Sequence, residues 1–337
     1  MRRFVRILAG TRLTMAGFAL LAAGTLAAYN LADAPVWWMV APLALLALNL
    51  AAAIVLRPAL RSGGLGLFHV ALLAGLLVAG WGRLTHLDGR VEVTEGAPLD
   101  AAQVEVTAAG PWNDGAWRRV EFLQGSWEVD YAPGVRRGHT RSTVWLPGER
   151  EPRTVGDDTP LVLAGYRFYT TSNKGFAPVV SWQREGEEAV AGALHMPSYP
   201  VQDWNQANAW TAPDGQALKF WLRIEQAIPE HSAWTLAART IPATLVVEAQ
   251  GQRHELRPGD AIRTGSATLR YERLSGWMGY RIFYDPTLLP LLAIALAGIA
   301  GLAWHLWASP SFPRMRESSG AALGPRLRGD DTTGATP

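Results

Sequence analysis

A single histidine, His69, lies inside an apolar segment that follows a glycine-rich start at Gly63. An ionisable side chain within a membrane span is costly, so it is by default a candidate functional residue. A neutral imidazole offers one ring nitrogen as a ligand for iron. The alternative is a structural hydrogen bond to a neighbouring helix, for which Asn49 in the preceding apolar segment is a suitable partner. The residue types therefore allow two interpretations of His69, an iron ligand or a helix–helix hydrogen bond.

Three further residues near the ends of apolar segments could take part in the same chemistry. His305 lies near the end of the last segment, at a depth comparable to that of His69, where it could ligate the iron from the opposite face. A polar residue between tryptophans is more simply an interfacial anchor. His86 and Arg83 lie just past the segment that contains His69. There His86 could receive the iron-containing ligand, and Arg83 could pair with a carboxylate group of that ligand. The simpler interpretation is a solvated loop histidine among basic residues.

No motif for an enzyme or for nucleotide binding occurs in the sequence. There is no G-x-S-x-G, no H-E-x-x-H and no Walker loop. The absence of cysteine excludes disulfides, zinc–thiolate sites and covalent cofactor attachment through C-x-x-C-H. Four histidines without metal-like spacing are predicted to be surface or loop residues: His139, His195, His231 and His254. The sequence therefore predicts a protein that is not itself an enzyme.

The elements that position these residues are mainly apolar helices. Of the 337 residues, 49% are hydrophobic and only 18% are charged, which is typical of a mixed membrane and soluble protein. Four segments are long and apolar enough to cross a hydrocarbon core of about 30 Å: Leu13–Ala32, Pro35–Leu56, Gly66–Gly82 and Leu288–Trp307. The predicted organisation is a basic N-terminus (1–12), three transmembrane helices (13–82), an exported domain (83–285), a fourth helix (286–307) and a tail (308–337).

Arginines orient the four helices. They lie before the first segment, between the second and third, and after the fourth: Arg2, Arg3, Arg6, Arg12, Arg57, Arg61, Arg314, Arg316, Arg326 and Arg328. The positive-inside rule then places both termini in the cytoplasm and residues 83–285 outside a bacterial inner membrane. A cleaved signal peptide ending near Ala32-Asp33-Ala34 is the rival interpretation. It is disfavoured because the apolar segment is long for one and Pro35 would follow the cut.

Between residues 83 and 285 the hydrophobic period changes to two, which is typical of strands. Trp117–Phe122 and Ser126–Tyr131 are predicted to form a hairpin around Leu123-Gln124-Gly125, and Pro197–Gln216 to form an irregular loop. Other predicted strands are Arg90–Glu95, Gln103–Thr107, Thr143–Leu146, Leu161–Thr170, Val179–Gln183, Leu218–Glu225, Ala243–Ala249 and Ala267–Arg273. The fold class is therefore four transmembrane α-helices plus an exported antiparallel β-rich domain, a sandwich or open barrel. Because hardly any linker precedes this domain, we expect it to be held rigidly against the membrane.

The tail 308–337 is rich in Ser, Pro, Gly and Arg without periodicity, and it is predicted to be disordered. The sequence of this tail looks like translated repetitive intergenic DNA, so no function is assigned to it. Much of the basic charge lies in the membrane flanks and in this tail. Nucleic-acid binding therefore gains no support from the net charge of +2.

Several short motifs follow one another in a recognisable order. They are Gly66-Leu67-Phe68-His69, Asp88–Gly96, Leu161–Tyr169, Lys174–Pro178, Trp277–Arg281 and Tyr284-Asp285-Pro286. With three apolar helices, an exported β-region and one closing helix, the chain resembles the ResB-like family, a membrane component of System II cytochrome c maturation. The resemblance extends from Leu13 to Trp307, and the exported region is shorter than in typical members.

The resemblance implies a function in haem handling. In that family the protein acts with a CcsA-like membrane partner to deliver haem to the outer side and to support its ligation to apocytochrome c. The family's intramembrane histidine, which follows a phenylalanine in the third helix, is a haem ligand and corresponds to His69. Transient haem is therefore the expected cofactor, and the lipid bilayer, the CcsA-like protein and apocytochrome c are the expected partners. The alternative is a membrane-anchored β-domain that serves as a scaffold of another envelope complex and binds no haem.

Overall fold

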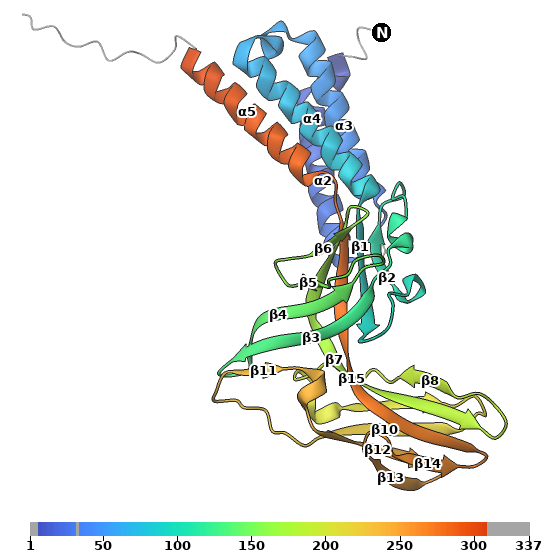
Figure 1. Cartoon of the computed structure of the whole chain (residues 1–337). Coiled ribbons are helices and arrows are strands. Elements are labelled where there is room, and N and C mark those ends of the chain that lie inside the picture. The colour runs from blue at the N-terminus through green and yellow to red at the C-terminus, as the bar shows by residue number, and fades with distance from the viewer. Residues whose placement is uncertain (1–5, 32–33, 309–337) are drawn as a thin grey trace, which may run out of the picture.

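The computed structural model describes residues 6–31 and 34–308. Within these ranges, four helices are long and apolar enough to cross a membrane: α2 (Thr11–Asn30), α3 (Trp37–Leu56), α4 (Gly63–Thr85) and α5 (Leu288–Ala308). Residues 87–284 form an antiparallel β-domain at one end of the helices (Figure 1). The predicted combination of four apolar helices with an antiparallel β-rich domain is confirmed. The tail from residue 309 onward lies outside the described residues.

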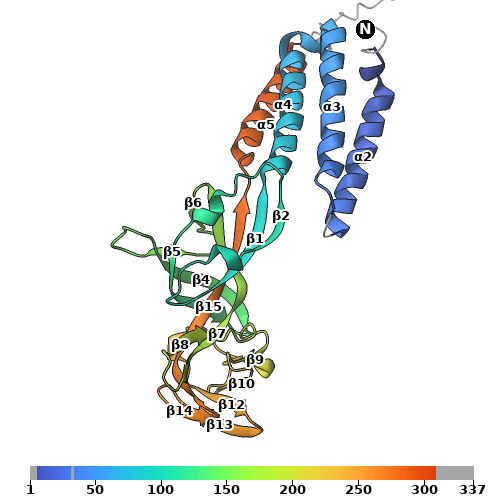
Figure 2. The ribbon, with the colours of Figure 1, turned by 90° about the vertical axis from the view of Figure 1, so that its right-hand side faces the viewer.

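The helices pack in sequence, α2 on α3, α3 on α4 and α4 on α5, with α2 and α5 at opposite ends of the series (Figure 2). The backbones of α4 and α5 meet at Gly64 and Gly301, where the absence of side chains allows close approach. A polar contact joins α2 to α3, in which Thr14 Oγ1 donates to Asn49 Oδ1 at 2.7 Å. The helices therefore form an open series in which α5 has one main neighbour.

Two long strands run through the whole β-domain. β7 (Tyr166–Arg184) and β15 (Ala267–Tyr284) pair antiparallel along almost their entire length. They belong to a seven-stranded sheet whose other members are β1 (Leu87–Thr94), β2 (Glu105–Ala109), β6 (Leu161–Leu163), β8 (Val190–Ala193) and β14 (Ala261–Thr264). β1, β2 and β6 lie at the half near the helices, and β8 and β14 lie at the far half (Figure 1).

Two smaller sheets pack on this long sheet. The sheet nearer the helices contains β3 (Leu123–Ala132), β4 (Arg136–Trp145), β5 (Arg153–Val155) and β11 (Trp234–Leu236). The far sheet contains β9 (Ala207–Thr211), β10 (Ala217–Ile224), β12 (Ala243–Ala249) and β13 (Gln252–Leu256). One cluster of buried hydrophobic side chains includes residues from all three sheets. The β-domain is therefore a sandwich with two lobes that share the β7–β15 ladder.

A buried polar triangle joins the two sheets of the lobe near the helices. Tyr280 Oη donates to Gln124 Oε1 at 2.7 Å, Gln124 Nε2 donates to Ser142 Oγ at 2.8 Å, and Ser142 Oγ lies 2.6 Å from Tyr280 Oη. All three side chains are buried, so their polar atoms must find partners within the protein. The triangle therefore fixes the position of β3 and β4 on β15.

The predicted hairpin around Leu123-Gln124-Gly125 is wrong. Its first strand is largely replaced by the short 3₁₀ helix η3 (Ala116–Arg119), and the predicted turn lies inside β3. Asp114 explains the helix, because its Oδ1 accepts a hydrogen bond from the Ala116 N–H at 3.0 Å and offers the backbone an alternative to strand pairing. The turn lies instead between β3 and β4, where Gly134 has a positive φ of 79°.

Two other predictions need correction. Leu161–Thr170 is not one strand, because a two-residue turn at Ala164 and Gly165, both at positive φ, folds β6 back on β7. The predicted loop Pro197–Gln216 contains the strand β9, which pairs with β10. The remaining predicted strands overlap β1, β2, β4, β7, β10, β12 and β15. The bounds of β12 agree with the prediction, and the ends of the others are shifted.

The sequence pattern did not predict the full length of β7 and β15, and the reason is physical. Residues 174–178 of β7 and 275–280 of β15 are buried throughout, so neither stretch alternates between buried and exposed positions. These stretches lie where the two lobes meet and both faces of the ladder are covered. The sequence of a strand that is covered on both faces does not alternate between hydrophobic and polar residues, so it lacks the pattern that predicts a strand.

The helices pass into the β-domain without a linker. α4 ends at Thr85 and β1 begins at Leu87, while β15 ends at Tyr284 and α5 begins at Leu288. Leu87 and Tyr284 lie opposite each other in the β1–β15 pair. The α4–α5 helix pair therefore continues directly as a pair of strands.

The β-domain also caps the end of α4. The Gly110 N–H donates to His86 O at 2.9 Å, and the Trp112 N–H donates to Leu84 O at 2.8 Å. The last carbonyls of a helix lack partners within that helix, so these bonds replace water and orient α4 against the domain. A Cβ atom at Gly110 would collide with the Leu84 carbonyl, so a glycine is required here. This geometry agrees with the expected rigid attachment.

Candidate functional site

His69 lies in the first half of α4 and is half-buried. Its Nδ1 lies 2.7 Å from Leu65 O, and because a carbonyl only accepts, Nδ1 carries the proton and Nε2 keeps its lone pair. The ring meets Phe68 edge-on, with 5.4 Å between the ring centroids. Asn49 bonds to Thr14 rather than to His69, so the predicted Asn49 contact is wrong. His69 therefore presents one nitrogen that is chemically competent as an iron ligand.

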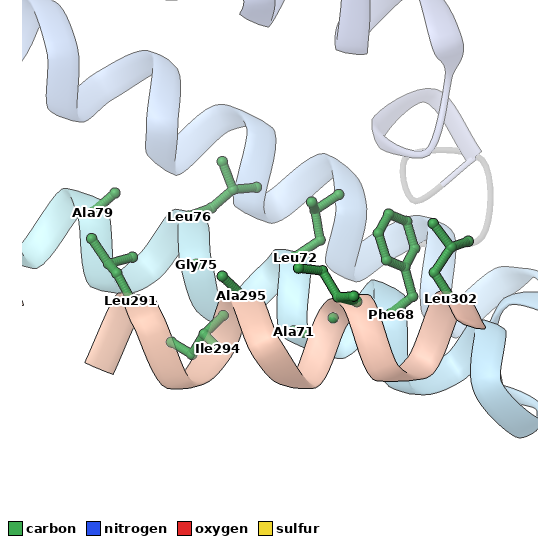
Figure 3. A pocket seen from close by; sticks show the side chains of 12 residues that line it. Phe68, Ala71, Leu72, Gly75, Leu76, Ala79, Leu291, Ile294, Ala295 and Leu302 are labelled. Carbon is green, nitrogen blue, oxygen red and sulfur yellow. The ribbon is translucent and has the colours of Figure 1, made fainter. Parts of the chain in front are cut away.

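An apolar groove of about 370 Å³ lies between α4 and α5 (Figure 3). Its wall consists of Phe68, Ala71, Leu72, Gly75, Leu76 and Ala79 from α4 and Leu291, Ile294, Ala295, Gly298, Ile299 and Leu302 from α5. These lining side chains carry no polar atom, so the groove suits an apolar ligand, and any ligating atom must come from its rim. Phe68 belongs to the wall and His69 follows it in α4. His69 is therefore adjacent in sequence to a wall residue of the groove, but it is not itself one of the residues that line the groove.

His305 is offset from His69 along the helix pair. Its backbone meets α4 at Gly64, five residues before His69. Five residues correspond to about 7.5 Å along a helix, which is more than one turn. The two histidines therefore do not lie at the common depth that we expected. The neighbouring Trp304 and Trp307 are exposed, as expected of interfacial residues.

Arg83 and His86 lie at the other end of α4, in the joint with the β-domain. His86 Nδ1 donates to Arg83 O at 2.8 Å, which leaves its Nε2 with the lone pair. Burial lowers the pKa of His86 below its usual range, and the charge of Arg83 contributes in the same direction, so the neutral form is favoured. Arg83 Nε is buried and has no hydrogen-bond partner among the described residues. The joint therefore contains a neutral imidazole beside an incompletely paired guanidinium.

Three of the four remaining histidines lie where the sequence predicted, at the surface. His139 and His231 are exposed, and His254 is partly exposed on β13. Within the described ranges, no group of three or more His, Cys, Asp or Glu residues is arranged to hold a metal ion.

His195 is the exception, because it belongs to a bonded cluster and not to a free loop. Its two ring nitrogens lie within hydrogen-bond distance of Glu92 and Thr94, and its ring stacks on Trp277. The alternating sequence of β1 places Glu92 and Thr94 on one face of the sheet. No signal in the sequence brings His195, about 100 residues later, to that face.

The comparisons with known proteins add no relative. Neither a scan against protein-family models nor a search of curated proteins finds a match to this chain.

Proposed function

We propose that this protein is a haem-handling membrane subunit that acts with a CcsA-like partner in cytochrome c maturation. In this proposal the chain lies in a bacterial inner membrane with both termini in the cytoplasm and the β-domain outside. The order of helices, β-domain and short motifs supports it. The observation that carries it is the Nε2 lone pair of His69, the residue that follows Phe68 of the apolar α4–α5 groove along the chain. His69 would be a ligand of the haem iron.

Residue types that suit the three chemical parts of a haem are present, but they are distributed over two positions along α4. An imidazole lone pair suits the iron, an apolar wall suits the porphyrin, and a guanidinium suits a propionate. His69 and Arg83 are fourteen residues apart in one helix, which corresponds to about 21 Å. They therefore belong to two successive positions along α4, the first at His69 and the second at His86 and Arg83. In this proposal haem is the cargo that the protein delivers, and it takes no part in a reaction of this chain.

The chain's own residues hold and guide that cargo. Leu65 fixes the tautomer of His69 through its carbonyl, and the Arg83 carbonyl does the same for His86. The low pKa of His86 keeps this imidazole neutral and able to ligate. The rigid joint keeps the second position at a constant place relative to the β-domain, where the partner and apocytochrome c would dock.

The test is the visible spectrum of the full chain purified in detergent from haem-replete cells. We expect a Soret band in the wild type that is lost in His69→Ala. The matched control is His139→Ala, which removes an exposed histidine of the β-domain and should leave the band intact. A wild type that stays colourless and does not take up added hemin, with or without its partner, contradicts the proposal. It would leave the scaffold alternative.

A further inference from the structure

A second cluster of reactive side chains lies in the β-domain, far from the apolar helices. Glu92 and Thr94 stand on the same face of β1, and His195, from the segment after β8, lies across them. Its Nε2 lies 2.7 Å from Thr94 Oγ1, and its Nδ1 lies 3.1 Å from Glu92 Oε2. One imidazole therefore bridges a hydroxyl and a carboxylate through its two nitrogens.

Further contacts hold the imidazole in place. Its ring is stacked on Trp277 with 5.4 Å between centroids and an interplanar angle of 12°. Asn208 Nδ2 donates to the His195 carbonyl at 2.7 Å. Asn173 Nδ2 donates to Glu92 Oε1 at 2.7 Å and orients the carboxylate. Such fixed geometry is what a positioned acid–base group requires.

The chemistry of the partners assigns the protons. The hydrogen bond from His195 lowers the pKa of Glu92, and that from Asn173 acts in the same direction, so Glu92 is a carboxylate at neutral pH although burial opposes ionisation. A carboxylate only accepts, so Nδ1 carries the proton. Nε2 then accepts the hydroxyl proton of Thr94. The order hydroxyl, imidazole, carboxylate is that of a nucleophile, its general base and the group that orients the base.

A groove opens beside the Thr94 hydroxyl. It has a volume of about 680 Å³, and residues of β8 and β9 line it together with Thr94 and the following turn. Trp210 and Ala193 give it apolar surface, and Arg273 gives it a cation. A cation in a groove can stabilise the oxyanion that forms when a carbonyl is attacked. Thr94 ends an eight-residue strand that starts at α4, so the groove lies about 26 Å from that helix.

We propose that Thr94, His195 and Glu92 form a hydrolytic site for a carboxylic ester. The distance from the helices favours a water-soluble ester over a bilayer lipid. The substrate would lie in the β8–β9 groove with its carbonyl at Thr94.

Each step of the reaction balances without another reagent. Thr94 Oγ forms a bond to the carbonyl carbon while its proton passes to His195 Nε2, and the carbonyl π electrons move to the oxygen. When the tetrahedral intermediate collapses, the alcohol leaves with the proton from Nε2 and an ester of Thr94 remains. Water then attacks this ester with Nε2 again as base, and the products are the acid, the alcohol and free Thr94. Glu92 acts only as a positioning residue.

The test uses the full chain in detergent with p-nitrophenyl acetate and p-nitrophenyl butyrate. We expect esterase activity and an acyl adduct on Thr94 by mass spectrometry. Both should fall by about 10²-fold or more in Thr94→Val and in His195→Ala, because nucleophile and base are lost. Thr94→Ser should retain activity. Thr107→Ala, which changes a threonine on the exposed strand β2, is the matched control and should match the wild type.

Two readouts separate chemistry from folding. The unfolding midpoint of Thr94→Val shows whether the variant is folded, and Thr94→Ser keeps the test valid if it is not. Glu92→Gln should lower kcat and leave KM unchanged, because Glu92 orients His195, and His195 acts only after the substrate is bound. Equal hydrolysis by the wild type and a folded Thr94→Val, with no adduct on Thr94, overturns the proposal. The cluster would then be a structural hydrogen-bond network only.

Discussion

The two histidines His69 and His195 show how one residue type serves different chemistry in two regions of this molecule. In the apolar helix α4, His69 donates a hydrogen bond from Nδ1 to the Leu65 carbonyl of the same helix and keeps the lone pair of Nε2. In the β-domain, His195 has both nitrogens engaged, one with a hydroxyl and one with a carboxylate. A ring nitrogen with a free lone pair can ligate a metal. A ring that is hydrogen-bonded through both nitrogens is suited to proton transfer. The surroundings of the ring, and not its identity, separate the two proposals.

The largest expected effect comes from breaking the joint that connects the two regions. We expect Gly110→Val to prevent accumulation of folded full-length protein, because its side chain would collide with the Leu84 backbone, which has no freedom to move aside. The measurement is monodispersity on size exclusion together with resistance to limited proteolysis. Gly192→Ala is the control, because a Cβ atom there meets open space. Normal folding of Gly110→Val would show that the helices and the β-domain are not rigidly coupled.

The second prediction sharpens the difference between the two rings. His69→Gly leaves the six other histidines in place (seven in the chain less one) and should lose the Soret band. His195 has no free nitrogen, and haem would reach His86 only after His69 along the proposed path. Exogenous imidazole should restore the Soret band in His69→Gly by supplying the missing ligand. If the band of His69→Gly equals that of the wild type without imidazole, another residue ligates the iron and the comparison fails.

The third prediction concerns the buried polar triangle that supports the β-domain. Tyr280→Phe removes one hydroxyl and leaves Gln124 and Ser142 short of a partner. Leaving a buried polar group unpaired costs about 1–3 kcal/mol, so we expect the free energy of unfolding to fall by that amount. Urea denaturation of the full chain in detergent measures it. Tyr169→Phe on the same sheet is the control, and an equal loss in both variants would mean that the triangle contributes nothing specific.

The smallest expected effect is a change in the pH dependence of stability. The folded state lowers the pKa of Glu92, so this residue adds stability above its ordinary value near 4.5 and loses that contribution as the pH falls through the folded pKa. Glu92→Gln cannot titrate, so its thermal midpoint should decline less than that of the wild type below about pH 4.5. Parallel curves for the two proteins would show that the Glu92–His195 contact does not stabilise the ionised carboxylate.

Much of the architecture could be predicted, because local rules determine it. Continuous apolar runs predicted all four helices, and period-two alternation predicted β1, β10 and β12. The strand prediction failed where a side-chain hydrogen bond to the backbone or a tight turn interrupts the strand pattern, as at Asp114 and at Ala164-Gly165. It also failed in the middle of β7 and β15, because two sheets cover both faces of the ladder there.

The candidate sites divide in the same way. His69 could be found from the sequence, since a histidine in an apolar run stands out by its cost of burial. Its free nitrogen, and the offset of His305, depend on backbone contacts that no sequence pattern contains.

The amino-acid sequence by itself determined the four apolar helices, the β-rich region between the third and fourth, and the presence of His69 within the third, because these follow from composition and period. Tertiary structure decided that the helix pair continues as a strand pair, that two lobes share one ladder, and that His195 meets Glu92 and Thr94. The physical reason is that pairing register and side-chain contacts between distant segments depend on how the whole chain packs.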